Sequence, residues 1–511
     1  MGQPVAMPPS PLAAGEKIPC VSYAPFRGDQ TPLDPATRIP GAQIDEDFAA
    51  LKSRTGCVRT YSIEHALDQI PGLARKHGLK VIQGIWLSSN PVSNRREIDG
   101  VVNLVRQYPD VISSVIVGNE VLLRGEMSGA DLAALIREVK ARVGVPVTYA
   151  DVWEFWLRHR EVYEAVDFVT IHILPYWEDF PIAARDAASH VDSIRRKMAA
   201  AFPGKDILIG ETGFPSQGRM REGALPTPAN QARVLHELLA LARRDGLRVN
   251  LIEAFDQPWK RGLEGTVGGF WGLLDTYRRD VKFLWGEPVS NHPSWARQAT
   301  GGVALVLAVV LAGMVAARRN APQPVVWAGV FACAVVAGFM VPLAIEKIPL
   351  ESFTAGGWLR SLAMGLVAVA APLLCAAALA HGAPTPAFAQ VLARREGRLR
   401  DPLRLALGLS LIAATVLALH VALGQVFDPR YREFHYAPLT AAIVPFAVLA
   451  LTARRGEGVR PVAEAAAAGI LVLSAVYIAF NESAANWQAL WLCGLLVSLA
   501  LILWRARAAP G

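Results

Sequence analysis

The stretch ILIGETGFPSQG, residues 207–218, passes from an apolar run directly into a turn that begins Gly-Glu-Thr-Gly. A short apolar run that is bounded by turn residues is typical of a buried β-strand. Glu211 therefore stands at the carboxyl end of an expected strand, where the chain turns back toward the surface. What a carboxylate does at that position depends on the fold around it.

Seven more stretches within the first 298 residues have the same character. The expected strands are IPCVSYA (from 18), CVRTYS (57), LKVIQGIW (79), VISSVIVGNE (111), PVTYAD (146), VDFVTIHI (166), DILIGETG (206) and VNLIEAFD (249). Segments such as ADLAALIREVKARV separate them, with apolar residues every three or four positions, as in amphipathic helices. Eight strand–helix pairs of this total length predict an α/β fold, a (β/α)8 TIM barrel. An open doubly wound sheet is the alternative.

The second half of the chain consists of long apolar runs separated by short arginine-rich ones. About 20 mostly apolar residues suffice to cross the hydrocarbon layer of a membrane. Seven spans are expected, at residues 300–317, 325–345, 358–380, 403–423, 437–453, 462–480 and 487–504. A buried core helix can be this apolar once or twice, but not seven times in succession. We therefore expect an N-terminal extension (1–17), a barrel (18–298) and an all-α transmembrane bundle of about seven spans (299–511).

The loops predict an orientation, because Lys and Arg accumulate in short loops on the cytoplasmic side of a membrane. The basic residues of alternate loops and of the tail are Arg318, Arg319, Arg394, Arg395, Arg398, Arg400, Arg454, Arg455, Arg460, Arg505 and Arg507. They place the C-terminus in the cytoplasm and, after an odd number of spans, the barrel on the other side, which in a Gram-negative bacterium is the periplasmic side of the inner membrane. The first 20 residues contain no apolar signal segment. Export then requires either an upstream signal or insertion of the first span.

The expected role of the transmembrane bundle is that of an anchor. His420 and Glu464 lie near span ends, where snorkelling or a bond to a neighbouring helix explains them. Aromatic residues on the outer side are expected to form an interfacial belt, or else to extend a binding platform beneath the barrel: Trp358, Phe427, Tyr431, Phe434, Tyr436 and Trp487.

Cysteine usage and charge add little about function. Cys333, Cys375 and Cys493 lie in expected spans as small apolar residues. Cys20 and Cys57 begin the first two strands; we expect two buried free thiols, with a disulfide as the alternative. The net charge of +7 needs no nucleic acid partner, because the loop arginines account for much of it. Neither a phosphate-binding glycine loop nor a metal-spacing His/Cys cluster stands out, so no cofactor and no metal are expected.

Two glutamates end strands at the rim where barrel active sites gather. Strand four ends in Asn119 and Glu120, and strand seven ends in Glu211. Either glutamate alone could simply cap the following helix. Two together suit cleavage of a glycosidic bond, in which one carboxyl group protonates the leaving oxygen and the other attacks the anomeric carbon; a separation of about 5 Å favours retention. We predict Glu120 as the acid/base and Glu211 as the nucleophile.

Other side chains near the strand ends suit a sugar, because aromatic faces match the apolar faces of pyranose rings. Besides Asn90, the residues expected to bind substrate are Tyr23, Tyr61, Trp86, Asn119, Tyr149, His172, Tyr176, Trp177, Phe214, Phe255, Asp256, Trp259, Lys260 and Trp271. Core packing explains any single ring equally well, but their grouping around two glutamates favours a saccharide cleft. Glu253 is expected to orient Glu211 or to bind substrate, the alternative being a satisfied buried carboxylate.

Several motifs taken together resemble glycoside hydrolase family 17 over residues 18–290. They are RTYS (59–62), GNE (118–120), GETGFPS (210–216), FDQPWK (255–260) and GFWGLLD (269–275). The resemblance implies a (β/α)8 barrel, retention of configuration and a β-1,3-glucan donor. It implies the same two roles for Glu120 and Glu211. It further assigns Asn119 to the sugar 2-hydroxyl and Tyr176 to holding Glu211.

A barrel of this kind fused to a polytopic membrane region also resembles the bacterial β-(1,6)-glucan synthases of cyclic β-1,3/1,6-glucan production. No cytoplasmic domain with a DxD-type nucleotide-sugar site is seen in the sequence. The resemblance therefore implies a transglycosylase that moves part of an existing β-1,3-glucan to a glucan acceptor, forming β-1,6 linkages. A membrane-anchored β-1,3-glucanase and a non-catalytic glycan-binding or sensing protein are the alternatives. The expected partners are donor and acceptor glucans, the lipid bilayer and, as a further candidate, a membrane glucan synthase.

Overall fold

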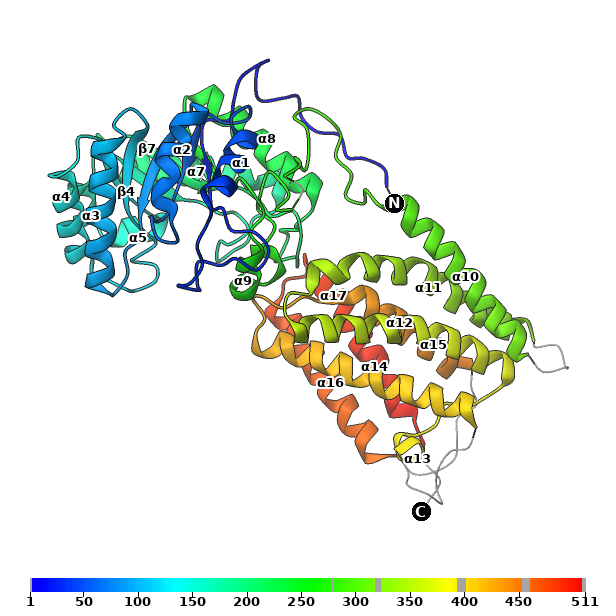
Figure 1. Ribbon diagram of the computed structural model, residues 1–511. Helices are drawn as coiled ribbons and strands as arrows, with labels where there is room; N and C mark the ends of the chain where they lie inside the picture. Colours follow the sequence, from blue (N-terminus) through cyan, green and yellow to red (C-terminus); the bar gives the residue numbers. More distant parts are fainter. Residues whose placement is uncertain (1, 278, 318–322, 393–400, 453–459, 508–511) are drawn as a thin grey trace. The chain divides into compact units, whose positions relative to one another are not determined.

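The computed structural model describes residues 2–277, 279–317, 323–392, 401–452 and 460–507 (Figure 1). The chain divides into two compact units. One comprises Pro4–Gln217 and Gly223–Asn291; the other comprises His292 onward with the short segments Met1–Gln3 and Gly218–Glu222. Eight of the loop arginines used to predict orientation lie outside the described residues: Arg318, Arg319, Arg394, Arg395, Arg398, Arg400, Arg454 and Arg455.

The first unit is a closed barrel of eight parallel strands in sequence order. The strands are β1 (Val21–Ser22), β2 (Cys57–Arg59), β3 (Lys80–Ile85), β4 (Ile112–Asn119), β5 (Val147–Val152), β6 (Val169–His172), β7 (Ile207–Thr212) and β8 (Arg248–Leu251). Val21 of β1 pairs with Leu251 of β8, which closes the barrel. The TIM barrel prediction is confirmed, and the open sheet is wrong.

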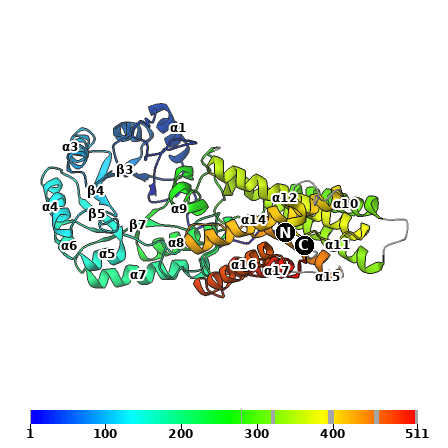
Figure 2. The same cartoon turned by 90° about the horizontal axis from the view of Figure 1, so that it is seen from below.

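Helices surround the strands on the outside of the barrel (Figure 2). They are α1 (Gly41–Leu51), α2 (Ile70–His77), α3 (Pro91–Gln107), α4 (Gly129–Lys140), α5 (Trp153–Arg158), α6 (Glu161–Ala165), α7 (Ala187–Ala201), α8 (Pro228–Asp245) and α9 (Arg261–Gly268). Local sequence sets their ends. Asn90 caps α3, because its side chain accepts hydrogen bonds from the backbone of Val92 and Ser93; its expected contact with a sugar stays a prediction. Gly246 ends α8 in a left-handed conformation that favours glycine.

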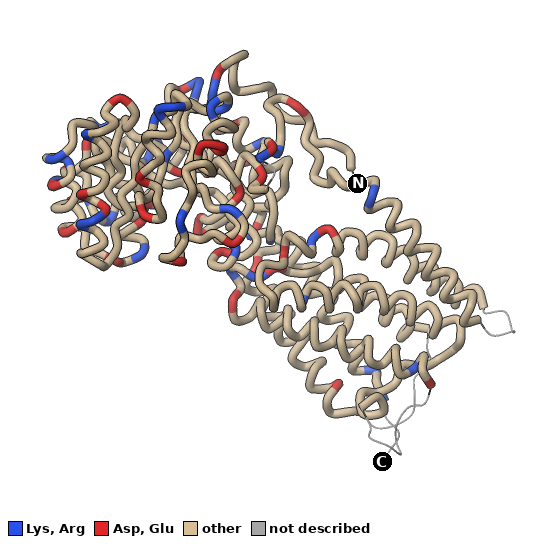
Figure 3. Tube along the Cα trace, viewed as in Figure 1, with Lys and Arg blue, Asp and Glu red and all other residues tan. Residues whose placement is uncertain are grey.

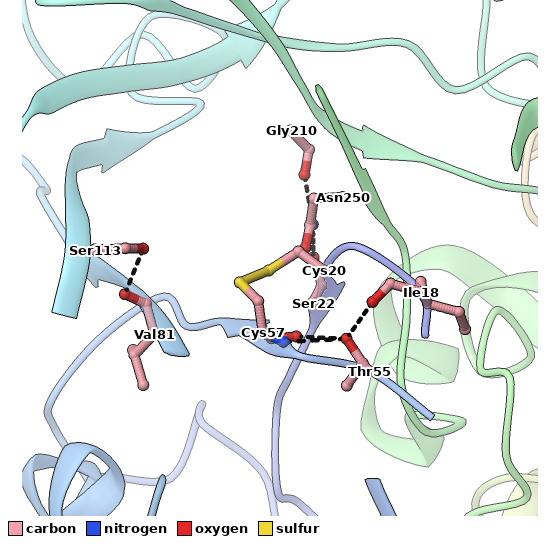
Figure 4. Close-up of a disulfide and its surroundings, with 9 residues drawn as sticks. All are labelled: Ile18, Cys20, Ser22, Thr55, Cys57, Val81, Ser113, Gly210 and Asn250. Atoms are coloured by element: carbon pink, nitrogen blue, oxygen red, sulfur yellow. Dashed lines mark hydrogen bonds between the residues drawn. A yellow bond between two sulfur atoms is a disulfide. The ribbon is translucent and has the colours of Figure 1, made fainter. Parts of the chain in front are cut away.

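Cys20 and Cys57 form a disulfide between β1 and β2 (Figure 4). The parallel register pairs Val21 with Val58, so the two preceding cysteines lie side by side with their Cα atoms 4.4 Å apart. The prediction of two free thiols is therefore wrong, and the alternative of a disulfide is confirmed. Whether the two cysteines meet depends on the register of β1 against β2, which the sequence does not reveal. Cys333 and Cys375, by contrast, are free and buried, as expected.

The second unit is helical. Its helices are α10 (Trp295–Ala316), α11 (Pro324–Glu351), α12 (Ala355–His381), α13 (Phe388–Leu392), α14 (Pro402–Phe427), α15 (Tyr436–Thr452), α16 (Val462–Asn481) and α17 (Trp487–Arg505). Within the described residues, six of them are long and apolar enough to cross a membrane. The remaining predicted span, the fifth, corresponds to α15, which is apolar but has only 17 residues. Figure 3 shows the charged residues near the ends of these helices and tan residues along their middles.

Particular side chains of the helical unit bear on the sequence predictions. Glu464 is buried and accepts a hydrogen bond of 2.7 Å from the backbone of Phe388 on α13, so a neighbouring helix does explain it. Trp358, Phe427 and Trp487 of the expected aromatic belt are exposed. Phe434 is buried, so it does not belong to such a belt.

Candidate active site

Glu120, Glu211 and His172 meet at the carboxyl ends of three strands of the barrel. Glu120 directly follows β4, His172 ends β6, and Glu211 is the penultimate residue of β7. One nitrogen or oxygen atom from each of the three lies within 4.8 Å of the others. The spacing of the two carboxylates suits a retaining glycosidase, in which the carboxyl groups are about 5 Å apart.

The backbone around Glu120 aims its side chain into this group. Glu120 adopts a positive φ of 53°, which is uncommon for a residue with a side chain. Its backbone nitrogen donates to the carbonyl of Ala150 at 2.8 Å, which fixes the end of β4 to β5. The side chain of Glu120 remains 23% exposed, whereas that of Glu211 is only 7% exposed. Glu120 is therefore the more accessible of the two carboxyl groups.

Arg59 of β2 is a central residue of the site that the sequence predictions missed. Its guanidinium is buried and donates to Glu211 Oε1 and to Asn119 Oδ1. It also stacks on the ring of Tyr61, with 3.9 Å between the guanidinium carbon and the ring centroid. The signal was available in RTYS, because an arginine inside a short barrel strand requires a partner with opposite charge.

Arg59, Tyr61 and His172 all approach the carboxylate of Glu211. Besides Arg59, the hydroxyl of Tyr61 donates to Glu211 Oε1 at 2.8 Å, and His172 Nε2 lies 3.7 Å from the same oxygen. Burial alone would raise the pKa of Glu211, but the charges of His172, Arg59 and Lys260 outweigh it and lower the pKa to about 2. Glu211 is consequently ionised over the ordinary pH range, as a nucleophile must be.

His172 links the two carboxylates. Its Nδ1 lies 2.8 Å from Glu120 Oε1, and its ring is fully buried. Burial lowers the pKa of His172, but the neighbouring carboxylates Glu211 and Glu120 raise it overall. Among the described residues these three side chains also have the spacing of a metal site. The guanidinium of Arg59 already supplies the positive charge that faces Glu211.

Glu253 forms a buried ion pair with Lys260, at 2.9 Å. Burial raises the pKa of Glu253 to about 7 in spite of Lys260. The alternative of a satisfied buried carboxylate fits this contact. Lys260, which is expected to bind substrate, in turn contributes to the low pKa of Glu211.

The remaining predicted site residues differ in how far they are exposed to solvent. Tyr61, Trp177 and Trp259 are partly exposed and Trp86 is 37% exposed. Tyr23 is buried and donates to Asp47 of α1 at 2.9 Å, and Tyr149 is buried and accepts from the backbone of Leu122 at 3.0 Å. The other members of the set are also buried: Asn119, Tyr176, Phe214, Phe255, Asp256 and Trp271. The exposed rings are those that a sugar can reach directly.

Tyr176 packs among aromatic rings close to the site. Its ring centroid lies 4.9 Å from Trp177, 6.2 Å from Phe214 and 6.3 Å from Trp271. The phenol of Tyr61 donates a hydrogen bond to Glu211. The role that the family resemblance assigns to Tyr176 stays a prediction.

Comparison with known proteins gives a family for the barrel. Residues 20–272 match the model of the BtgE/BtgC glycoside hydrolase domain. The probable beta-glucosidase btgE of Aspergillus fumigatus is 29% identical over 244 residues, which are 46% of this chain and 42% of that protein. The glucan 1,3-beta-glucosidase of Arthroderma benhamiae is 26% identical over 255 residues, 47% of this chain and 82% of that protein.

A solved structure also aligns with the barrel. It is the glycoside hydrolase family 17 beta-1,3-glucanosyltransferase from Rhizomucor miehei, with 25% identity, a TM-score of 0.46, and coverage of 52% of this chain and 94% of that chain. The chain spans less than half the length of the first curated relatives that it matches. The match of residues 20–272 confirms the resemblance found in the motifs: this part of the chain is a glycoside hydrolase domain of the BtgE/BtgC family.

Proposed function

We propose that this protein is a membrane-anchored, retaining β-glucan transglycosylase. It cleaves a β-1,3-glucan donor through a covalent glycosyl-enzyme intermediate and transfers the glycosyl group to a glucan acceptor, forming β-1,6 linkages. The observation that carries the proposal is the approach of Glu120 and Glu211 to within 4.8 Å across the mouth of the barrel.

In the first step Glu211 attacks the anomeric carbon of the donor. The contacts from Arg59 and Tyr61 hold the carboxylate ionised and aimed. As the new ester bond forms, the glycosidic bond breaks and Glu120 gives its proton to the departing sugar oxygen. Asn119, fixed by the second nitrogen of Arg59, is placed to bond a hydroxyl of the reacting sugar.

In the second step the roles of the carboxyl groups reverse. Glu120, now ionised, takes the proton of an acceptor hydroxyl, whose oxygen attacks the anomeric carbon and displaces Glu211. His172 lies between the two carboxylates, 2.8 Å from Glu120 Oε1 and 3.7 Å from Glu211 Oε1, and is placed to partner either of them. If water takes the place of the acceptor, the same step is hydrolysis.

The donor is proposed from the family and from the exposed surface of the site. Relatives from Arthroderma benhamiae and Candida albicans are named glucan 1,3-beta-glucosidase. The exposed and partly exposed rings of Trp86, Trp177 and Trp259 suit the faces of pyranose units. The buried ring of Tyr176 packs edge-on against Trp177.

The proposed location is a bacterial inner membrane, with the barrel on the periplasmic side. The helices that are long and apolar enough to span a bilayer support membrane anchoring. The disulfide between Cys20 and Cys57 supports an oxidising compartment for the barrel, because disulfides persist mainly in such compartments. A membrane glucan synthase that makes the donor remains a candidate partner.

Product analysis tests the function. The purified full-length protein is incubated with linear β-1,3-oligoglucosides, and the products are resolved by size and linkage. Transfer gives longer, branched or 1,6-linked products, whereas a β-1,3-glucanase gives only shorter ones. Glu211→Gln should abolish turnover and leave the fold intact, as judged by circular dichroism. Substantial residual turnover would remove Glu211 from the role of nucleophile.

A further inference from the structure

A hollow of about 640 Å³ lies at the rim of the barrel beside the end of β4. Its polar walls come from the loop after β3 with the start of α3, and from the loop after β4 with the start of α4. They are formed by Ser88, Ser89, Asn94, Glu126, Ser128 and Asp131. A volume of roughly 300–1,000 Å³ is usual for a ligand pocket. The residues predicted from the sequence to bind substrate are not among those that line it.

Arg124 joins this hollow to the catalytic residues. Its guanidinium donates to the backbone carbonyl of Asn119, to that of Leu87 at 2.8 Å, and to Glu126 Oε2 at 2.8 Å. It also lies over the ring of Trp86, 4.4 Å from the centroid. The side chain of Arg124 thus contacts the backbone of Asn119, the exposed ring of Trp86 and Glu126 in a wall of the hollow.

The walls are preorganised for a ligand rich in hydroxyl groups. Asn94 is held at both ends by the backbone of Ser88, at 2.8 and 2.7 Å, and Ser128 donates to Asp131 at 2.6 Å. A carboxylate has about four acceptor positions. Each of the carboxylates of Glu126 and Asp131 therefore retains lone pairs for hydroxyls of a ligand. Lysine and arginine do not contribute to the lining, so an anionic ligand is disfavoured.

The position of the hollow selects between the two sugars of the proposed reaction. The acceptor must deliver its hydroxyl to Glu120, because Glu120 takes the proton in the second step. The turn that builds one wall continues directly from Glu120: Arg124 N bonds to Glu120 O at 2.9 Å, and Glu126 N to Val121 O at 3.1 Å. A chain that rests in the hollow therefore lies against the backbone segment that carries the acid/base.

We propose that this hollow is the acceptor site, that its ligand is an uncharged β-glucan chain, and that Trp86 is the platform between it and Glu120. The proposal rests on the proposed function, since only a transglycosylase needs a bound acceptor. Arg124 is a positioning residue of the site, because it acts through Trp86 and the backbone of Asn119.

The test fills the hollow with a bulky side chain in the full-length protein. Ser89 is exposed and lines the hollow, so Ser89→Trp occupies the space without removing a buried group. Ser53→Trp is the matched control, because Ser53 is exposed in the turn before β2, at the opposite end of the barrel. Ser89→Ala separates loss of the hydroxyl from loss of space. All variants are first checked for an unfolding temperature within a few degrees of the parent.

Two measurements follow. In the first, a linear β-1,3-hexasaccharide is titrated calorimetrically into each variant made in the Glu211→Gln background. In the second, transfer by the active variants is followed as added acceptor is varied. Ser89→Trp should weaken binding and raise the apparent KM for acceptor by tenfold or more, Ser89→Ala by threefold or less, and Ser53→Trp should match the parent.

The outcomes separate the two proposals. Equal affinity and equal acceptor KM in Ser89→Trp and Ser53→Trp would overturn the acceptor site, even where the parent shows transfer. A parent that yields only shorter products overturns transglycosylation, and the calorimetric comparison then decides alone whether the hollow binds glucan.

Discussion

Arg59 of β2 and Glu211 of β7 form a buried ion pair in the barrel, with side chains that are 1% and 7% exposed. Removing one partner of such a pair leaves an uncompensated charge, which is costly in a buried site. The same guanidinium donates a hydrogen bond to Asn119. Arg59 therefore lowers the pKa of Glu211 and also fixes the position of the Asn119 side chain. These two effects can be separated by mutation.

Replacing Arg59 by Met should shift the acid limb of activity to higher pH. The positive charge of Arg59 helps to hold the pKa of Glu211 at about 2. Without it the pKa rises, and because the nucleophile acts as a carboxylate, activity is lost at a higher pH as the solution is acidified. The measurement is kcat/KM against pH on a β-1,3-oligoglucoside.

Arg59→Lys is the control for this prediction. Lysine keeps the charge but cannot reproduce the two-pronged contact of arginine with Glu211 and Asn119. We expect kcat/KM to fall by about 100-fold, the scale for loss of a preorganised contact at a reacting group, while the acid limb stays near that of the parent. An acid limb that is unmoved in Arg59→Met as well would show that Arg59 does not set the charge of Glu211.

The low pKa of Glu211 also predicts that the free energy of unfolding depends on pH. A carboxyl group whose pKa falls from 4.5 to about 2 on folding stabilises the fold above pH 4.5, and this stability is lost as the pH falls toward 2. In Glu211→Gln this part of the pH dependence should disappear. Chemical unfolding at several values between pH 5 and pH 3 measures it.

Replacing Glu120 by Gln should trap the covalent intermediate when the donor carries a good leaving group. The aryl oxide of an activated aryl glycoside departs without protonation, so the glycosyl group can still form an ester with Glu211. The second step lacks its base and becomes slow. Intact-protein mass spectrometry should then show an adduct of one glycosyl unit, located on the peptide that contains Glu211.

The matched control is Glu120→Gln combined with Glu211→Gln, which keeps the same substitution but removes the proposed nucleophile. It should show no adduct with the same donor. Adduct formation on another residue, or in the double variant, would contradict the assignment of Glu211.

The strands and the positions of the two glutamates could be predicted from the sequence, because apolar runs mark the strands and both glutamates stand where a run ends. Apolar runs gave all eight strands, and the rim of a parallel barrel fixes where a residue such as Glu211 must stand. Arg59 was missed because a search for apolar runs passes over a single charged residue inside a strand. Its meaning depends on Glu211 and Asn119, which are 152 and 60 residues away in the chain.

Side-chain direction and register could not be predicted. Strand β1 has two residues, too few for an alternating pattern to show that Tyr23 points to Asp47 of α1. The disulfide between Cys20 and Cys57 likewise depends on how β1 and β2 align. The hollow beside Trp86 arises from two loops whose conformation is set by Arg124, and no single stretch of sequence carries that information.

Removing the disulfide should destabilise the barrel. Cys20 and Cys57 are 37 residues apart, and closing a loop of this length stabilises a fold by about 2–4 kcal/mol. The double variant Cys20→Ser/Cys57→Ser should therefore unfold at a temperature about 5–10 °C lower. Calorimetry with and without reductant measures the change. Cys493→Ser, which removes a free thiol of α17, should leave the barrel transition and its response to reductant as in the parent.

The proposed orientation predicts opposite labelling of two introduced cysteines. Ala484 is exposed in the loop between α16 and α17, and Arg507 follows the end of α17. If α17 crosses the inner membrane with the C-terminus in the cytoplasm, a membrane-impermeant maleimide added to cells with a permeabilised outer membrane should label Ala484→Cys. Arg507→Cys should be labelled only after lysis. Both variants carry Cys493→Ser to remove the partly exposed thiol of α17. Labelling of Arg507→Cys before lysis, with protection of Ala484→Cys, would place the barrel in the cytoplasm, where the proposed periplasmic glucan donor could not reach Glu120.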